Sequence, residues 1–177
     1  MTTSARFNAN GDQLYRNSTP YNSKAAYTVL FWHKPASFGG SGGYQTILIA
    51  YRGADAGWDA IYTTNAGDLY VDVNGTTADT GVNLSTSIWK YIGLRRTATS
   101  VLEVLVDGTV VYTSTVNIAS DGSAASFYFG SEPYSTWSDS NVAYARVWET
   151  NLTNGEVASE TDSASAIKTA SLYGDYP

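Results

Sequence analysis

The chain has 177 residues, of which 43% are hydrophobic and 15% charged, with a net charge of −6 and no cysteine. This composition predicts one globular domain over residues 1–177, with a polar tail over 162–177, that buries a core without disulfides. The negative charge disfavours a nucleic-acid partner, because phosphate contacts need clustered Lys and Arg. The one basic pair, Arg95-Arg96, is expected to place an outward charge beside a strand end. No apolar run approaches the ~18 residues of a membrane-spanning helix, so no membrane insertion is expected.

The segment from Met1 to Arg16 contains neither an apolar core nor a small-residue cleavage site. We therefore expect no signal peptide. Synthesis in a cytoplasm follows from this expectation, with incorporation into a virion as an alternative destination.

Short β-rich runs alternate with clusters of Gly, Asn, Asp and Ser, which is typical of an all-β sandwich. Strands are predicted at Ala5–Asn8, Gln13–Arg16, Tyr27–Lys34, Gln45–Arg52, Trp58–Thr64, Asp68–Asn74, Ile88–Arg95, Val101–Val106, Thr109–Val116, Ser126–Gly130 and Val142–Glu149. Between two of these strands, Asp107-Gly108 predicts a tight hairpin, since both central residues of such a turn need positive φ. Thr153 followed by Glu156 forms a capping box and predicts one short helix.

The strand that begins at Asp68 alternates cleanly between apolar and polar residues. Tyr70 and Asp72 therefore share a face that is at least partly wet. One strand earlier, Trp58 and Tyr62 also share a face. The fold class predicted is all-β: a two-sheet antiparallel β-sandwich, or jelly roll, with one short C-terminal helix.

With these elements placed, the chain resembles the concanavalin A-like jelly-roll superfamily, in particular its laminin G-like and pentraxin-like domains. Four segments carry the resemblance: Tyr27–Pro35, Trp89–Leu94, Val104–Gly108, and Ala145–Leu152 followed by Glu156. The resemblance implies the jelly-roll fold. Similar domains bind sugars or proteins, cleave glycans, or decorate virion and phage surfaces.

Catalysis by a retaining glycosidase would need two carboxylates about 5 Å apart. The similar enzymes carry them on one strand, and no such run occurs here. Asp68 and Asp72 share a face but lie about 13 Å apart along their strand, while an approach by Asp59 from a neighbouring strand stays open. His33, the one histidine, is expected to be an outward or hydrogen-bonded strand residue. The chain is therefore predicted not to be an enzyme.

Calcium is the one cofactor considered, and it takes six to eight oxygen ligands. The resemblance implies a carboxylate in the last strand, at a position where this chain has Ala143, which puts the usual structural calcium in doubt. Asp139 with Glu132, or Asp12 with Asn10, could build a different site. Solvated loop acids that cap turns are the alternative interpretation.

Sugar rings stack on aromatic side chains while nearby carboxylates and amides bond their hydroxyls. The first place with this composition is a loop that contains Glu132, Tyr134, Trp137, Asp139 and Asn141. The second is a sheet face that could align Tyr51, Trp58, Tyr62, Tyr70 and Asp72. The alternatives are a packed surface lid for the loop, and sandwich core or a subunit interface for the sheet face.

The sequence thus predicts a non-catalytic recognition module that binds carbohydrate through exposed Tyr and Trp. The first alternative is a structural component of a virion or phage appendage that makes protein–protein contacts. The second is a glycan hydrolase or lyase with an unrecognised site. The expected partner is a glycan or a protein surface, and the oligomeric state is left open.

Overall fold

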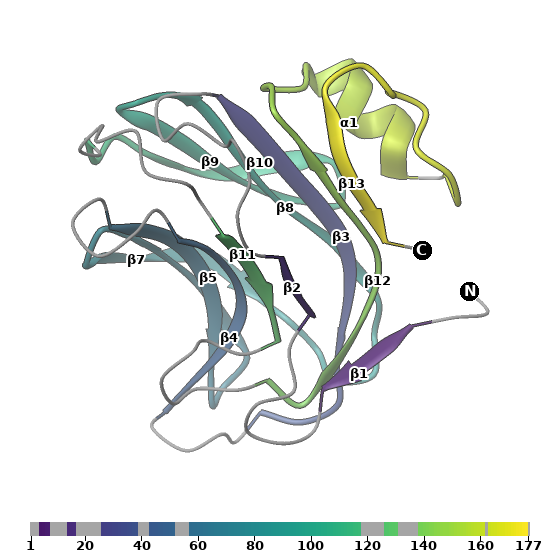
Figure 1. Cartoon of the computed structure of the whole chain (residues 1–177). Coiled ribbons are helices and arrows are strands. Elements are labelled where there is room, and N and C mark those ends of the chain that lie inside the picture. Colours follow the sequence, from purple (N-terminus) through teal and green to yellow (C-terminus); the bar gives the residue numbers. More distant parts are fainter. Residues whose placement is uncertain are drawn as a thin grey trace.

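The computed structural model describes residues 4–7, 14–16, 26–38, 43–51, 57–117, 126–130, 138–161 and 163–176. Within this part, two antiparallel sheets pack face to face and one short helix lies outside them (Figure 1). The predicted all-β sandwich is confirmed. No helix in these ranges is long and apolar enough to cross a membrane.

The seven-stranded sheet runs in the order β1-β12-β3-β8-β9-β10, with β13 also paired to β12. Its strands are β1 Ala5–Phe7, β3 Tyr27–Pro35, β8 Lys90–Ala98, β9 Val101–Val106, β10 Thr109–Ser114, β12 Ser140–Trp148 and β13 Leu172–Tyr176. β1 and β13 follow each other along one edge of β12, where β1 pairs with residues 140–142 and β13 with residues 145–148. The segment predicted as a polar tail thus contains a strand that extends the sheet.

The six-stranded sheet runs in the order β2-β11-β4-β5-β6-β7. Its strands are β2 Leu14–Arg16, β4 Tyr44–Tyr51, β5 Trp58–Thr64, β6 Asp68–Val73, β7 Thr76–Asn83 and β11 Ser126–Phe129. The sequence did not predict β7. This strand forms one edge of the sheet, next to β6.

Two tight hairpins have the same backbone geometry. Asp107 and Gly108 have φ of 50° and 78°, so the predicted turn between β9 and β10 is confirmed. Asn74 and Gly75 repeat it with φ of 52° and 82°, and they join β6 to β7. Positive φ at both central residues matches the right-handed twist of the strands on either side.

The core lies between the two sheets and has aromatic rings at its centre. The ring centres of Phe31 and Phe129 are 5.2 Å apart, and those of Tyr27 and Phe127 are 5.8 Å apart, both edge to face. Each pair joins one strand of the seven-stranded sheet to β11 of the other sheet. These contacts fix how the two sheets face each other.

A buried ion pair crosses the same core. Arg96 of β8 bonds both carboxylate oxygens of Asp59 on β5, at 2.5 and 2.9 Å, and both side chains are buried. The hydroxyl of Tyr27 donates to the same carboxylate at 2.7 Å. Arg95 is buried too and bonds Glu103 at 2.7 Å. The expectation of an outward charge at this basic pair is therefore wrong, because a buried arginine is tolerated when its donors are paired.

His33 also departs from its prediction. It is 1% exposed and lies beside Phe31, with 6.4 Å between ring centres. Neither of its ring nitrogens has a hydrogen-bond partner among the described residues. Burial lowers the pKa of His33 to about 3, so the ring is neutral near pH 7. Within the part of the chain that the structure describes, it is neither outward nor hydrogen-bonded, and this environment does not suit a catalytic base.

The helix α1 spans Asn154–Thr161 and begins with the predicted capping box. The backbone N–H of Thr153 donates to the Glu156 carboxylate at 2.8 Å, and the N–H of Glu156 donates to the Thr153 hydroxyl at 3.3 Å. In Figure 1, α1 lies on the outer side of the seven-stranded sheet, away from the other sheet. Val157 of α1 and Trp148 of β12 belong to a second apolar cluster at this contact.

Candidate functional site

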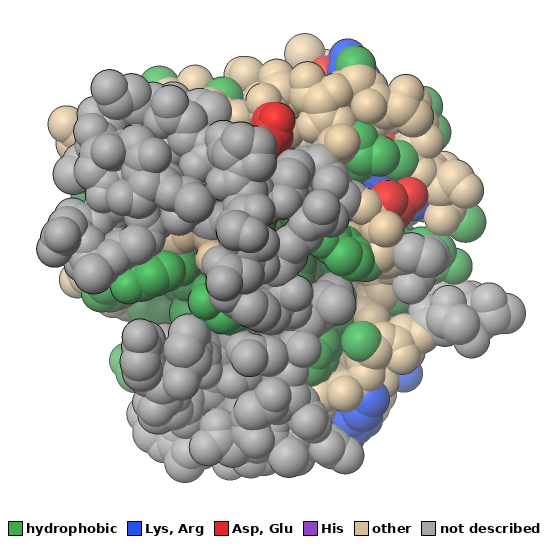
Figure 2. Space-filling view, viewed as in Figure 1, with side chains coloured by type: hydrophobic (Ala, Val, Ile, Leu, Met, Phe, Trp, Pro, Cys, Tyr) green, Lys and Arg blue, Asp and Glu red, His purple; other side chains and the backbone are tan. Residues whose placement is uncertain are grey.

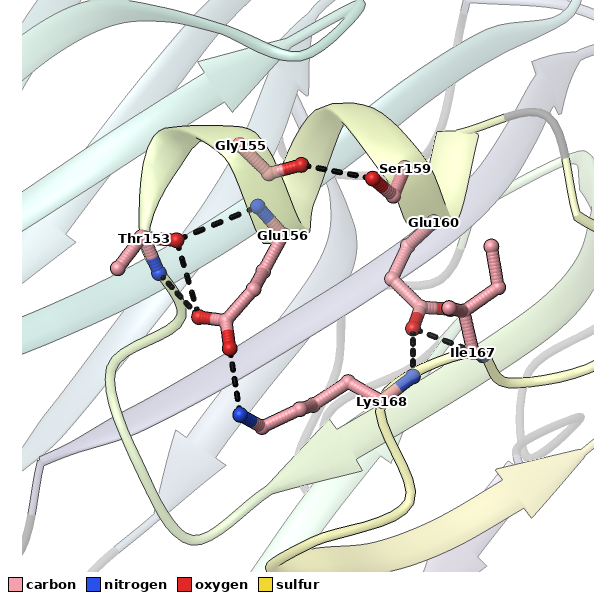
Figure 3. A pocket seen from close by; sticks show the side chains of 7 residues that line it. All are labelled: Thr153, Gly155, Glu156, Ser159, Glu160, Ile167 and Lys168. Carbon is pink, nitrogen blue, oxygen red and sulfur yellow. Dashed lines mark hydrogen bonds and ion pairs between the residues drawn. The ribbon is translucent and has the colours of Figure 1, made fainter.

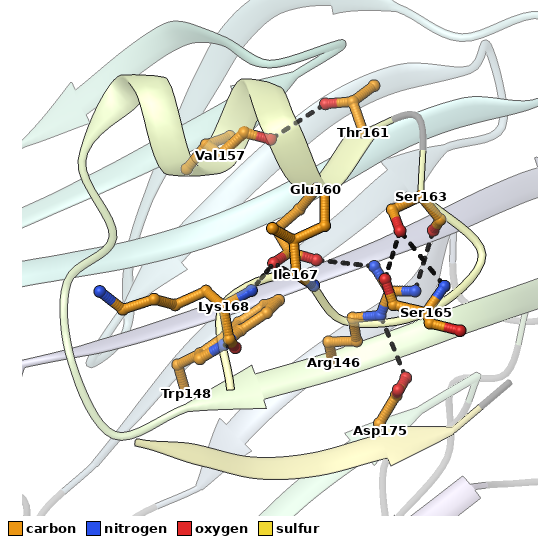
Figure 4. Close-up of polar contacts among 10 residues, drawn as sticks. All are labelled: Arg146, Trp148, Val157, Glu160, Thr161, Ser163, Ser165, Ile167, Lys168 and Asp175. Carbon is orange, nitrogen blue, oxygen red and sulfur yellow. Dashed lines mark hydrogen bonds and ion pairs between the residues drawn. The ribbon is translucent and has the colours of Figure 1, made fainter. Parts of the chain in front are cut away.

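The outer face of the seven-stranded sheet is covered by α1 and the segment that follows it. There, the buried Arg146 guanidinium bonds the Glu160 carboxylate at 2.8 Å and Asp175 of β13 at 3.0 Å (Figure 4). The other carboxylate oxygen of Glu160 accepts the backbone N–H groups of Ile167 and Lys168 at 2.9 and 2.6 Å. These bonds fasten the C-terminal segment to the sheet and leave no open platform at this point.

A hollow of about 360 Å³ lies between α1 and the segment after it. Its lining consists of Thr153, Gly155, Glu156, Ser159, Glu160, Ile167 and Lys168 (Figure 3). Lys168 bonds Glu156 across the hollow at 2.5 Å. This ammonium and the bonds from Thr153 lower the pKa of Glu156 to about 2. Because these polar groups form hydrogen bonds with one another, we interpret the hollow as part of the contact that holds the C-terminal segment against α1, and not as a ligand site.

The outer face of the six-stranded sheet is different, because large aromatic side chains there remain exposed. Trp58 is 38% exposed and Tyr44 is 45% exposed. We call this surface the tyrosine face and define it by Tyr44, Tyr51, Trp58, Tyr62 and Tyr70 of β4, β5 and β6. Figure 1 shows β4 and β5 curving so that the face turned away from the other sheet is concave. Figure 2 shows hydrophobic side chains at the surface in the region where Figure 1 draws β5 and β7.

Three tyrosines form one group on this face. Tyr62 and Tyr70 are directly paired across β5 and β6. The ring of Tyr44 stands edge-on to both, with ring centres 5.4 Å from Tyr62 and 6.4 Å from Tyr70. Tyr51 and Trp58 are paired across β4 and β5 and form a second group. Trp58 and Tyr62 are four positions apart on β5, which separates the two groups by about 13 Å.

Asp72 is on the predicted face but lies under the surface, with 8% exposure. It accepts the hydroxyls of Tyr62 at 3.1 Å and Thr77 at 3.0 Å, and the N–H of Gly75 at 2.7 Å. Burial raises the pKa of Tyr62 well above its usual range, while its bond with Thr77 acts in the opposite direction. Asp72 therefore holds the ring of Tyr62 in place, and its carboxylate is already engaged.

Two further carboxylates flank Tyr70. Asp79 of β7 is its cross-strand partner, and Asp68 lies two positions earlier on the same face of β6. The negative charge of Asp79, then burial and the charge of Asp68, raise the pKa of Tyr70. Asp68 accepts bonds from Thr64 and Asn83, whereas Asp79 is exposed and accepts the N–H of Gly81 through one oxygen.

The aromatic loop that the sequence also favoured is described only at its end. Glu132, Tyr134 and Trp137 lie outside the described residues. Asp139 is engaged, because its carboxylate bonds Arg6 at 2.5 Å and Ser37 at 2.8 Å. Asn141 is half-buried within β12. Whether this loop forms a platform stays a prediction.

The described residues do not fit the calcium site that the family resemblance implies. Ala143 is buried in β12, and its methyl group offers no oxygen. In the ranges described, no three His, Cys, Asp or Glu side chains are grouped to hold a metal ion. Asp12 lies outside those ranges, so its candidacy stays an untested prediction.

The carboxylates considered for catalysis are also separated by the fold. Asp59 points into the core, where Arg96 and Tyr27 engage it, while Asp68 and Asp72 are on the outer face of β6. The approach of Asp59 to these two residues, left open by the sequence, is therefore wrong. Opposite sides of a sheet cannot form the paired-carboxylate geometry of a glycosidase.

Two residues, one on the tyrosine face and one beside it, were missed from the sequence. Tyr44 precedes the strand as predicted, and the register shift between Thr46 and Leu48 hides its place in the alternation. Asp79 is on β7, which the sequence did not predict. The turn signal Asn74-Gly75 could have revealed that strand.

A laminin G-type family model, described as the concanavalin A-like lectin/glucanases superfamily, matches residues 8–158 of this chain. The chain belongs to this superfamily. No curated protein sequence matches it significantly.

Solved structures show the same fold at low identity. A heptameric pentraxin from Limulus polyphemus has a TM-score of 0.65 at 15% identity, with 93% of this chain and 82% of that one covered. Domain 4 of an extracellular arabinanase from Geobacillus stearothermophilus, solved with arabinotriose, has a TM-score of 0.63 at 16% identity, with 90% of this chain and 87% of that domain covered. Trypanosoma rangeli sialidase with sialic acid has a TM-score of 0.65 at 16% identity. The match covers 77% of this chain and 23% of the sialidase, so this chain spans under a quarter of that enzyme.

Proposed function

We propose that the protein is a non-catalytic carbohydrate-binding module whose tyrosine face holds an oligosaccharide. The observation that carries the proposal is the exposed aromatic surface on a sheet face that no described helix or strand covers, with Tyr44 45% and Trp58 38% exposed. Flat aromatic rings offer the C–H faces of a sugar an apolar contact, and nearby polar groups can bond its hydroxyl groups.

The spacing of the two aromatic groups favours a chain of sugars over a single ring. The group of Tyr44, Tyr62 and Tyr70 and the group of Tyr51 and Trp58 lie about 13 Å apart along β5. One sugar ring cannot contact both groups, whereas a short oligosaccharide can. The similar arabinanase domain was solved with a trisaccharide, arabinotriose, which supports a ligand of this kind.

The side chains around the rings also suit a sugar. Thr64 and Thr77 place hydroxyls on the same outer face, and Asn83 adds an amide at the edge of the sheet. Ile49, the large aliphatic side chain on this face, is only 6% exposed. The core of a protein-binding surface is depleted of charged residues, whereas carboxylates flank the rings of this face.

The test measures oligosaccharide binding by a glycan array followed by calorimetry on the ligands found. Tyr70→Ala and Trp58→Ala should each weaken binding about fivefold or more, since an aromatic contact with a ligand contributes roughly 1 kcal/mol or more. Trp89→Ala is the matched control, because Trp89 precedes β8 in the other sheet, where Lys34 lies over its ring.

No binding by the wild-type protein at millimolar sugar would contradict the proposal. A stable oligomer that Tyr44→Ser and Trp58→Ser convert to a monomer would instead favour the structural alternative, in which this face is a protein–protein contact. Light scattering on the same variants separates these outcomes.

A further inference from the structure

The charge around the tyrosine face narrows the kind of sugar that fits it. Three carboxylates, those of Asp68, Asp72 and Asp79, belong to the outer face of β6 and to β7. Every Lys and Arg with a described side chain belongs instead to the seven-stranded sheet or the C-terminal segment. In the described part of the chain, the tyrosine face therefore has negative charge without a cation to balance it.

We propose that the tyrosine face selects an amino sugar, in which a free amine carries positive charge, over neutral and acidic sugars. This inference rests on the proposed function, since it names the class of carbohydrate that the same face binds.

Asp79 is the residue best placed to receive the amine. It is the cross-strand partner of Tyr70, so a sugar stacked on that ring lies next to the carboxylate. One of its oxygens accepts the N–H of Gly81 at 2.8 Å. Among the described residues, the other oxygen accepts no hydrogen bond and remains available to an ammonium group.

The two neighbouring carboxylates differ in how many hydrogen bonds they already accept. Asp72 accepts bonds from Tyr62, Thr77 and Gly75, so it holds the ring of Tyr62 in place and has little capacity for a ligand. Asp68 accepts one bond on each oxygen and retains lone pairs toward the surface. The raised pKa of Tyr70 shows that the fields of Asp79 and Asp68 reach the point where a ring would stack.

Aromatic rings add to this selectivity. The face of a tyrosine ring attracts a cation that lies over it. Tyr44, Tyr62 and Tyr70 present rings at steep angles to one another, 69° and 68° for the two contacts of Tyr44. An ammonium group at this cluster meets aromatic surface and a carboxylate together, whereas a sugar carboxylate there meets repulsion from both.

The experiment compares two soluble oligosaccharides of equal length and linkage by calorimetry at pH 6 and low salt. One is a β-1,4-linked glucosamine oligomer, and the other is its fully N-acetylated form. The amine oligomer should bind roughly two- to fivefold more tightly, as expected for a partly exposed charge pair. This advantage should shrink as salt is added, because exposed charges are screened.

Asp79→Asn should remove most of the advantage of the amine, so that the two oligomers bind with nearly equal affinity. Glu149→Gln is the matched control, an exposed acid at the end of β12 in the other sheet. Its affinity for both oligomers should equal that of the wild type.

Each other outcome is distinct. Equal or tighter binding of the N-acetylated oligomer overturns the inference and leaves the proposed function standing. No binding of either oligomer, together with a negative glycan array, overturns the proposed function itself. Binding of a lysine-rich peptide as tightly as the amine oligomer, without dependence on Tyr70, assigns the attraction to net charge alone and also overturns the inference.

Discussion

The two sheets of this sandwich have opposite outer faces. On the seven-stranded sheet, α1 and the C-terminal segment cover the surface, and charged groups such as Arg146 and Glu160 are buried in pairs. On the six-stranded sheet, aromatic rings stay exposed beside carboxylates that have no described arginine or lysine near them. The covered face is built for stability, and the open face has the features of a binding surface. The proposed function thus assigns stability to one sheet and ligand binding to the other.

The largest expected effect on stability comes from removing the buried ion pair on the covered face of the seven-stranded sheet. Glu160→Ala leaves the buried Arg146 without its main partner and frees the N–H groups of Ile167 and Lys168. Loss of one partner of a buried ion pair should lower the free energy of unfolding by about 3–5 kcal/mol. Urea denaturation measures this change, with Glu149→Gln as the exposed control.

If the comparison of the two faces holds, oligosaccharide affinity of the folded Glu160→Ala protein should match that of the wild type. A large loss of affinity, or a stability change under 1 kcal/mol, would contradict the division between the two sheets.

A smaller effect concerns stability in acid, which depends on His33 in the core between the two sheets. The unfolded chain binds a proton at His33 near pH 6.5, whereas burial keeps the folded pKa at about 3. Because only the unfolded state gains the proton in this window, the free energy of unfolding should fall by roughly 1 kcal/mol per pH unit from pH 6.5 toward pH 3. Above pH 6.5 His33 contributes no slope.

The measurement compares urea denaturation of the wild type and His33→Leu between pH 7 and pH 4. The slopes that arise from carboxylates are common to both proteins and cancel in the difference. Identical slopes for the two would mean that the folded protein also takes up the proton at His33.

The smallest effect is expected at the hairpin that joins β6 to β7 in the six-stranded sheet. Gly75 has φ of 82° and nothing within 4 Å of where a Cβ would be added. Gly75→Ala should therefore cost only the conformational strain, about 1 kcal/mol. Thermal or urea unfolding measures the loss, and Gly155→Ala, in α1 with open space and ordinary φ, should be neutral or slightly stabilising. A cost above 3 kcal/mol would mean that the hairpin carries more of the stability than its exposed position suggests.

Local signals in the sequence were enough to predict most of the fold. The alternation from Asp68 onward placed Tyr70 and Asp72 on the outer face, and the Asp107-Gly108 turn has the predicted geometry. β13 was missed because its place depends on pairing with β12 and on the bond between Arg146 and Asp175, neither of which is local in sequence.

Buried polar residues were the harder problem. Arg96 looked like a surface residue, because its partner Asp59 is 37 positions away in the chain. His33 is in a strand with apolar residues on both faces, so the sequence did not indicate which side faced the core. The candidate site fared in the same way. The shared face of Trp58, Tyr62 and Tyr70 was predicted. Tyr44 was missed, and Asp79 depended on recognising β7.

β7 has one more consequence, for how copies of this protein behave in a crowded solution. It forms the edge of the six-stranded sheet, and an edge strand can template pairing with another chain. Its sequence, Thr-Thr-Ala-Asp-Thr-Gly-Val-Asn, is mostly polar and has no large apolar side chain other than Val82, and the register shifts in its pairing with β6. An irregular, polar edge with a charge at Asp79 is a poor template. The composition that hid β7 from sequence prediction thus also protects the sheet against aggregation.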